Sequence, residues 1–278
     1  MGDEIFSRTV QLERMTSPEV KRACAEAHGV AIIPVGAVEV HGPHLPVGTD
    51  SIETFEIGLR AAKLAGVVIT PLVWYGNSRS FMDFPGSVGV RPEVLKELVK
   101  DIALSLLHHG FDRLVILDGH GGNYGILDAL IEEIHLDTGA LICHARAWEM
   151  ATLPKPEGTP DYDGHGGSSE TSAMLALCPE DVDRTKFVDS APNIDLTRFG
   201  SVFPSPSGIL GQGPVTFPLS MGEMVEAGHH GNPSFASKER GEGLLAVKAA
   251  ALVELLQALK EGRLHWRGMG ERPGKERR

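Results

Sequence analysis

Short apolar runs alternate with longer amphipathic segments along this chain. The apolar runs lie at 30–35, 67–72, 114–117 and 140–144, and their Val, Ile and Leu content is typical of strands buried on both faces. Helical periodicity predicts helices after Thr16 and at about 51–64, 92–109, 124–137, 172–177 and 238–259. The alternation predicts an α/β fold with a mostly parallel central sheet and helices on both faces.

Start and stop signals support these helices. Thr16 and Glu19 form a capping-box pattern, Pro92 suits a first helical turn, and Gly66 and Gly110 end two of the segments. Stretches rich in Pro, Gly, Ser or Asp at 152–166 and 200–220 predict long loops, which in a compact fold are usually functional or disordered. We expect one domain over residues 1–278, with a charged tail from about 265 to 278.

The first polar cluster follows the apolar run at 30–35. It contains Glu39, His41, His44 and Asp50 within twelve residues. Side chains two apart at a strand end point the same way, so Glu39 and His41 are expected to face one ligand. Carboxylates and imidazoles suit a divalent transition metal, and the absence of a close-spaced cysteine motif favours an open site over a closed structural one.

The second and third clusters are glycine-rich. Asp118-Gly119-His120-Gly121-Gly122-Asn123 directly follows the run at 114–117, and its glycines allow a ligand to approach the backbone. The segment from Gly164 to Ser172 contains His165 and Glu170 at the end of a long loop. Each cluster alone could be a turn with a surface histidine. The three together, two of them directly after buried strands, favour a catalytic or metal site at the carboxyl edge of the sheet.

Other histidines lack this support. The pairs His108-His109 and His229-His230 have no neighbouring carboxylates on a strand end, so we do not expect them to be ligands.

The composition limits the partners and the cellular compartment that we expect for this protein. The formal net charge of −11 argues against nucleic acid and anionic membrane as partners. The three cysteines form no motif, which indicates a reducing compartment. No run is long and apolar enough to span a membrane, and the acidic start lacks the features of a signal peptide. We expect a cytoplasmic protein.

The three clusters, in this order, resemble the motifs of the creatininase (creatinine amidohydrolase) family. They read EVHGPHLPVGTD at 39–50, DGHGGN at 118–123 and HGGSSETS at 165–172, and the resemblance extends over roughly residues 10–260. It implies a three-layer α/β/α fold and a homo-oligomer, often a hexamer. It also implies two divalent metal ions per subunit (Zn, Mn or Fe) that share a bridging hydroxide.

The resemblance also assigns roles to residues. Glu39 and His120 match ligands of one ion and His41 a ligand of the other, while Asp50 matches the bridging carboxylate. Glu170 matches the glutamate that completes the second ion's ligands in most members; others carry a glutamate in the second motif, where this chain has Gly122. His165 matches the proton shuttle. His44, Asp118 and Asn123 are expected to orient the ligands.

Departures from the family pattern mark the region that faces the substrate. Ser80 and Phe81 stand where members often carry Glu-His, and Gly166 and Ser168 replace the alanine and first glutamate of the third motif. We therefore expect substrate contacts from Ser80, Phe81, Gly121, Trp148 and Ser168. Trp74 and Tyr75, like Phe81 and Trp148, could form an apolar wall or simply pack in the core.

The expected activity is hydrolysis of a non-peptide amide C–N bond in a small molecule, cyclic amides included, and the departures argue against creatinine itself. A peptidase that matures a small modified peptide, as mycofactocin-type relatives do, is an alternative. A formamide deformylase is another alternative. A non-catalytic metal-binding scaffold is a fourth reading, which the retained set of ligands and His165 disfavours.

Overall fold

A computed structural model of the chain describes residues 5–193, 207–210, 213–216 and 219–264. Its centre is a four-stranded, wholly parallel sheet in the order β2–β1–β3–β4. The strands are β1 (Val30–Val35), β2 (Val68–Ile69), β3 (Arg113–Asp118) and β4 (Leu141–Arg146). The predicted α/β fold with a parallel sheet is thereby confirmed.

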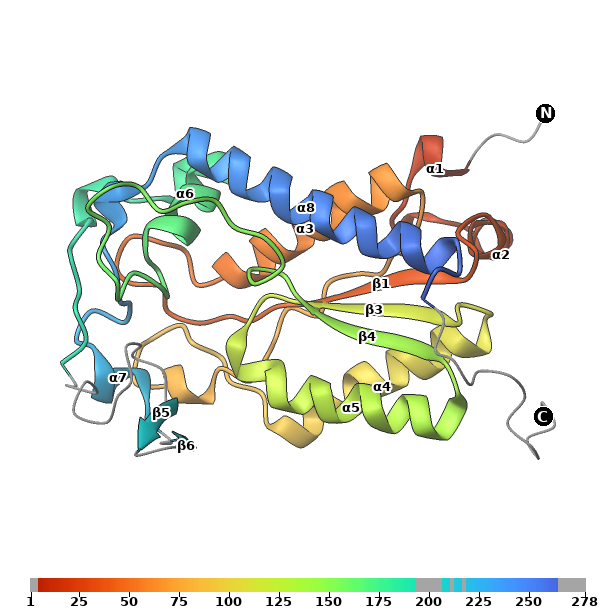
Figure 1. Cartoon of the computed structure of the whole chain (residues 1–278), viewed down its shortest axis with the longest axis horizontal. Coiled ribbons are helices and arrows are strands. Elements are labelled where there is room, and N and C mark those ends of the chain that lie inside the picture. Colours follow the sequence, from red (N-terminus) through yellow and green to blue (C-terminus); the bar gives the residue numbers. More distant parts are fainter. Residues whose placement is uncertain (1–4, 194–206, 211–212, 217–218, 265–278) are drawn as a thin grey trace.

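Helices cover both faces of the sheet (Figure 1). One face carries α3 (Thr49–Ala65), α6 (Ser168–Leu177) and α8 (Lys238–Lys260), and the other carries α4 (Pro92–His108) and α5 (Tyr124–Thr138). Outside these layers lie α1 (Ile5–Arg8), α2 (Ser17–Glu26) and α7 (Met221–Met224). The predicted capping box of Thr16 and Glu19 is present at the start of α2.

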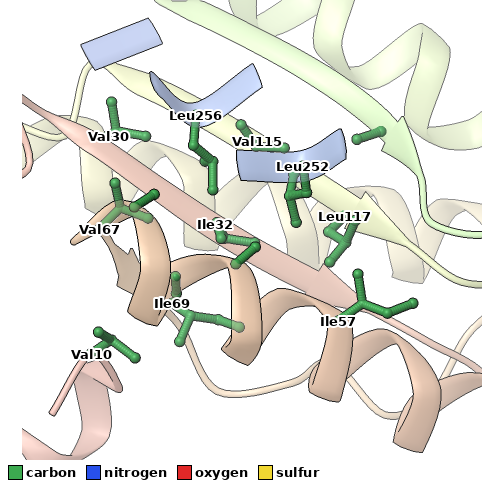
Figure 2. Close-up of a cluster of buried hydrophobic side chains, with 14 of the residues drawn as sticks. Val10, Val30, Ile32, Ile57, Val67, Ile69, Val115, Leu117, Leu252 and Leu256 are labelled. Carbon is green, nitrogen blue, oxygen red and sulfur yellow. The ribbon is translucent and has the colours of Figure 1, made fainter. Parts of the chain in front are cut away.

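Alternating residues of β1 divide the core into two halves. Ile32 packs with Ile57 of α3 and Leu252 of α8 (Figure 2), whereas Ile33 belongs to the cluster that includes Leu95 of α4 and Leu127 of α5. Burial on both faces explains why the strand reads as an unbroken apolar run.

The edge strand β2 is shorter than the run at 67–72 predicted. Pro71 has no N–H to donate, so the ladder stops after Ile69. The chain then returns to the sheet at Val73, whose N–H donates to Pro34 and whose carbonyl accepts from Gly36.

Two helices begin earlier than predicted. The helix expected from residue 51 begins at Thr49, so Asp50 lies in its first turn, where a carboxylate interacts favourably with the helix dipole. The helix expected from residue 172 begins at Ser168, which places Glu170 in a first turn as well. Asp163 accepts the backbone N–H and the hydroxyl of Ser168, and these bonds stabilise the early start.

The loop expected over 200–220 contains a short antiparallel pair, β5 (Ser207–Leu210) and β6 (Gly213–Thr216), so that prediction is wrong over these residues. The other residues of 200–218 and the expected tail at 265–278 lie outside the described residues. Within the described part of the chain, no helix has the length and apolar character needed to cross a membrane.

Candidate metal centre

The register of the sheet brings the first two polar clusters together. β1 pairs with β3 from Val30 opposite Arg113 to Val35 opposite Asp118, so both strands end at one level. The segments that follow them carry Glu39, His41 and His120 to one edge, where Asp50 and Glu170 approach from the first turns of α3 and α6. All five of these residues are at most 7% exposed.

His120 faces two carboxylates. Its Nδ1 lies 3.2 Å from Glu39 Oε2 and 3.2 Å from Asp50 Oδ2. One donor atom from each of these three residues could hold a single ion.

His41 forms a second set on the other side of Asp50. Its Nε2 lies 3.0 Å from Asp50 Oδ1 and 3.7 Å from Glu170 Oε2. Asp50 therefore turns one carboxylate oxygen to each histidine. This is the arrangement expected of a carboxylate shared by two ions.

Backbone carbonyls select the nitrogen that each histidine offers. A carbonyl oxygen only accepts hydrogen bonds, so the nitrogen facing it must carry the proton. His41 Nδ1 donates to the carbonyl of Glu39 at 3.1 Å, and His120 Nε2 donates to that of Asn77 at 3.2 Å. The other nitrogen of each ring faces the carboxylates, and in a neutral ring it would have the lone pair that a metal-bound imidazole requires.

The buried carboxylates of this cluster need positive charge beside them. Burial alone would lower the pKa of His41, but Asp50, Glu170 and Glu39 outweigh it and raise that pKa to about 10. The pKa of His120 is also well above its usual value, because Glu39 and Asp50 overcome the effect of burial. Burial raises the pKa of Glu170 to about 7. Protons or metal ions must compensate these carboxylates.

Two observations fit metal ions in particular. Glu39 Oε2 and Asp50 Oδ2 are buried atoms without a hydrogen-bond partner. Among the described residues, no lysine or arginine pairs with Glu39, Asp50 or Glu170; the nearby Lys248 pairs with Glu53 instead. Buried carboxylates without a lysine or arginine partner, beside imidazole nitrogens that face them, make a chemically suitable site for divalent ions.

His165 lies against this cluster. Its ring centroid is 4.2 Å from that of His41, its Nε2 donates to the carbonyl of Val40 at 2.7 Å, and its Nδ1 lies 3.8 Å from Glu39 Oε1. Burial and the neighbouring His41 hold its pKa well below the usual value, so the ring is neutral. Its Nδ1 could also join Glu39 and His41 around an ion.

The residues expected to contact substrate differ in their surroundings. Phe81 is buried with its ring centroid 4.8 Å from His165, whereas Ser80 is exposed. A side chain at Gly121 would meet no atom within 4 Å, so space lies in front of it. Trp148, 37% exposed, lines a small cavity together with Asp50 and Glu170.

Ser168 is fully buried and donates its hydroxyl to Asp163 at 2.6 Å, so it has a structural partner already. Trp74 and Tyr75 are about half exposed, at 47% and 52%. Neither packs in the core.

The three residues expected to orient ligands are all buried. Asp118 Oδ1 accepts the N–H of His120 at 3.1 Å and the side-chain amide of Asn123 at 2.8 Å. His44 Nε2 donates to the carbonyl of Gly166 at 3.1 Å, beside His165. Their role in orienting the ligands stays a prediction.

Sequence reasoning missed several residues behind the site. Asp163 fixes the His165 loop, because its Oδ1 accepts from Ser168 and Asn232, at 2.9 and 3.0 Å. His144, on β4, contacts Asp118, and Lys248 pairs with Glu53 beside the cavity. For His144 and Lys248 the sequence offers one signal of a role behind the site: each is a polar residue within an otherwise apolar strand or helix face.

His229 and His230 lie close to the site although neither belongs to a possible ion-binding group among the described residues. The backbone N–H of His230 donates to the carbonyl of His165 at 2.9 Å, and the ring of His229 lies 5.0 Å from that of His44. The pair therefore supports the His165 loop.

A parallel sheet flanked by helices, with a buried carboxylate–imidazole cluster at its carboxyl edge, defines an α/β enzyme with a candidate metal centre. Residues 13–256 match the family model for creatininase, described as creatinine amidohydrolase. The chain belongs to the creatininase family, whose members are amidohydrolases that act on C–N bonds, and it is an enzyme of that class.

Individual relatives support the assignment. The chain is 28% identical over 273 residues to creatinine amidohydrolase from Pseudomonas putida, covering 91% of this chain and 98% of that protein. It is 32% identical over 213 residues to a mycofactocin precursor peptide peptidase from Mycolicibacterium smegmatis, covering 71% and 80%. A solved structure of a putative creatinine amidohydrolase from Bacteroides fragilis superposes with a TM-score of 0.76 at 26% identity, covering 96% and 100%.

Proposed function

We propose that this protein is a dinuclear metal-dependent amidohydrolase that cleaves a non-peptide amide C–N bond, in a cyclic or open-chain small molecule. The observation that carries the proposal is the division of the Asp50 oxygens, at 3.0 Å from His41 and 3.2 Å from His120. Glu39 and His120 would hold one ion, His41 and Glu170 the other, and Asp50 both.

Solved relatives support the type of ion. One is described as creatininase Mn, and another as a Zn-Zn type of a creatininase variant. Imidazole and carboxylate ligands suit Zn, Mn and Fe alike. Two such ions, when bound, would polarise an amide carbonyl and lower the pKa of water towards neutrality.

His165 would move the proton. Its Nε2–H is held by the Val40 carbonyl, so Nδ1 is the atom that can accept a proton and pass it to the leaving nitrogen. The low pKa of the ring keeps Nδ1 unprotonated in the resting site. Phe81, in contact with the same ring, would keep water from its outer side.

The surroundings of the site would select the substrate. Gly121 leaves open space, and Trp148 provides an indole beside the cavity at Asp50 and Glu170. Because Ser80 and Phe81 stand where relatives often carry Glu-His, we propose a substrate other than creatinine. We further propose that the chain forms a single domain and assembles as a homo-oligomer, specifically a hexamer.

A peptidase for a modified peptide is the second candidate, favoured by the 32% identity to the Mycolicibacterium smegmatis peptidase. A deformylase is a third: a relative from Methanothermus fervidus, 26% identical over 66% of this chain, is a formylamino-pyrimidine deformylase. Formate release would identify the deformylase, and cleavage of short peptides the peptidase. Ligand binding without turnover would indicate a scaffold.

The test combines metal analysis with a substrate screen. Purified protein is analysed for metals and then incubated, with Mn²⁺ or Zn²⁺ added, with lactams, hydantoins, imides, formamides and short peptides, and products are read by mass. We expect bound metal and hydrolysis of one non-peptide amide class. His41→Ala should abolish turnover, whereas His109→Ala, at an exposed histidine, should not. Metal-free protein with full activity, or an unaffected His41→Ala variant, would refute the proposal.

A further inference from the structure

His144 is a buried histidine held between two carboxylates. Its side chain is 1% exposed, with Nε2 3.2 Å from Asp118 Oδ2 and Nδ1 2.8 Å from Asp128 Oδ1. Ionised carboxylates only accept hydrogen bonds, so both ring nitrogens donate and the ring is an imidazolium. Burial opposes that charge, but the bonds to Asp118 and Asp128 outweigh it and raise the pKa of His144.

Asp118 connects His144 to the backbone of His120 through hydrogen bonds. Its Oδ2 faces His144, while its Oδ1 accepts the His120 N–H at 3.1 Å and the Asn123 amide at 2.8 Å. The position of His120 therefore depends on how Asp118 is oriented.

A second path leads from Asn123 to the His120 ring. Asn123 Oδ1 accepts the N–H of Asn77 at 2.8 Å, and the carbonyl of Asn77 accepts His120 Nε2–H at 3.2 Å. That bond leaves His120 Nδ1 to face Glu39 and Asp50. The two paths close a loop in which Asp118 fixes both the backbone and the ring of His120.

The outer end of the assembly is partly exposed. The side chain of Asp128 is 49% exposed and accepts from Arg146 at 3.0 Å, and Arg146 stacks on the Tyr124 ring with its guanidinium carbon 4.2 Å from the centroid. Charges alternate from Asp118 through His144 and Asp128 to Arg146. A substitution at Asp128 can thus perturb the assembly without opening a cavity in the core.

We propose that His144 is a positioning residue for the metal centre: through Asp118 it fixes the orientation of His120 and so sets the ion affinity of the half of the site formed by Glu39, Asp50 and His120. This inference rests on the proposed function, since it requires that the cluster binds metal. His144 has no such role in the other half, formed by His41, Asp50 and Glu170.

The experiment is calorimetric titration of Zn²⁺ into the metal-free, full-length protein. We expect two binding events in the native protein and, in His144→Gln, one weakened by about 10–100-fold and the other unchanged. Asp128→Asn should weaken the same event to a smaller extent. His135→Gln is the matched control, because His135 lies on the same helix, α5, about two turns beyond Asp128, and within the described part of the chain its ring bonds only to the carbonyl of Ala140.

A variant that carries Glu170→Gln shows which binding event belongs to which half of the site. The tight zinc binding that this variant keeps should belong to the half that contains His120, and adding His144→Gln to it should weaken that binding. Circular dichroism and unfolding in chelator show whether each variant folds; should His144→Gln not fold, Asp128→Asn carries the test.

The outcomes of these titrations distinguish a failure of the proposed function from a failure of the inference about His144. Native protein that binds no zinc would overturn the proposed function. Native protein that binds two ions, with His144→Gln and Asp128→Asn unchanged, would overturn this inference alone. Equal weakening of both events, or the same loss in His135→Gln, would show a general effect on stability and would also overturn it.

Discussion

The carbonyl oxygen of Val40 lies 2.7 Å from Nε2 of His165 and fixes which ring nitrogen is free. Substituting His165 by Gln should leave the metal ions bound, because the five other donors remain, but remove the proton acceptor. We expect kcat to fall by about 10²–10⁴-fold. Turnover and metal content are measured on the same preparation. Loss of metal would instead identify His165 as a ligand, and unchanged turnover would exclude the proton-transfer role.

Asp50 should matter to both ions, whereas Glu170 should matter to one. Asp50→Asn removes the charge shared by His41 and His120, so we expect little bound metal after dialysis. Glu170→Gln should retain about one ion, since the half with Glu39 and His120 is intact. Metal per subunit is measured by plasma mass spectrometry, with Asp101→Asn, at an exposed position of α4, as the control. Equal metal loss in both acidic variants would contradict a bridging Asp50.

Gly122 and Gly121 offer a matched pair of substitutions. A Cβ at Gly122 would lie 2.5 Å from the carbonyl oxygen of Asn77 and would also clash with the His120 ring, but one at Gly121 would touch nothing within 4 Å. We expect Gly122→Ala to cost about 1–3 kcal/mol of stability and to weaken metal binding. Gly121→Ala should change neither by much. Urea unfolding and zinc titration check this; similar results for the two variants would refute it.

The buried pair of Lys248 and Glu53 should be costly to break. Both side chains are under 10% exposed, at 6% and 9%. Lys248→Met leaves a buried carboxylate unpaired, so we expect a loss of about 3–5 kcal/mol, largely recovered in the double variant with Glu53→Met. Arg60→Met, at a more exposed ion pair with Glu242, should cost less than about 1 kcal/mol. Urea unfolding in chelator measures all of these, and a double variant as unstable as the single one would contradict the account.

His144 should stabilise the fold more at low pH than at high pH. Its folded pKa lies above the ordinary value of 6.5 because Asp118 and Asp128 outweigh burial; Tyr124 contacts its ring, and Arg146 pairs with Asp128. Its contribution is therefore complete below the unfolded pKa and is lost as pH rises through the folded pKa. We expect the difference in unfolding free energy between native protein and His144→Gln to be larger at about pH 5.5 than at about pH 9. A difference that grows with pH would have the wrong sign.

Much of the fold follows from local patterns in the sequence. The apolar runs predicted β1, β3 and β4 because strands covered on both faces need apolar side chains on both sides. The run at 67–72 was overestimated because apolar content does not show where Pro71 interrupts a ladder. The early starts of α3 and α6 were missed because their caps depend on partners such as Asp163 that only the folded chain brings near.

The sequence by itself determined the candidate donors: Glu39, His41, Asp50, His120 and Glu170 are chemically recognisable, and three of them lie within twelve residues. Only the tertiary structure decided how these side chains are arranged around one another. Strand register placed the ends of β1 and β3 level, and backbone carbonyls fixed which nitrogen of His41 and His120 faces the carboxylates. His144, distant in sequence from every donor, became a support for His120 only when β4 paired with β3. Hydrogen bonds depend on positions in space, and those positions arise from packing over the whole sheet.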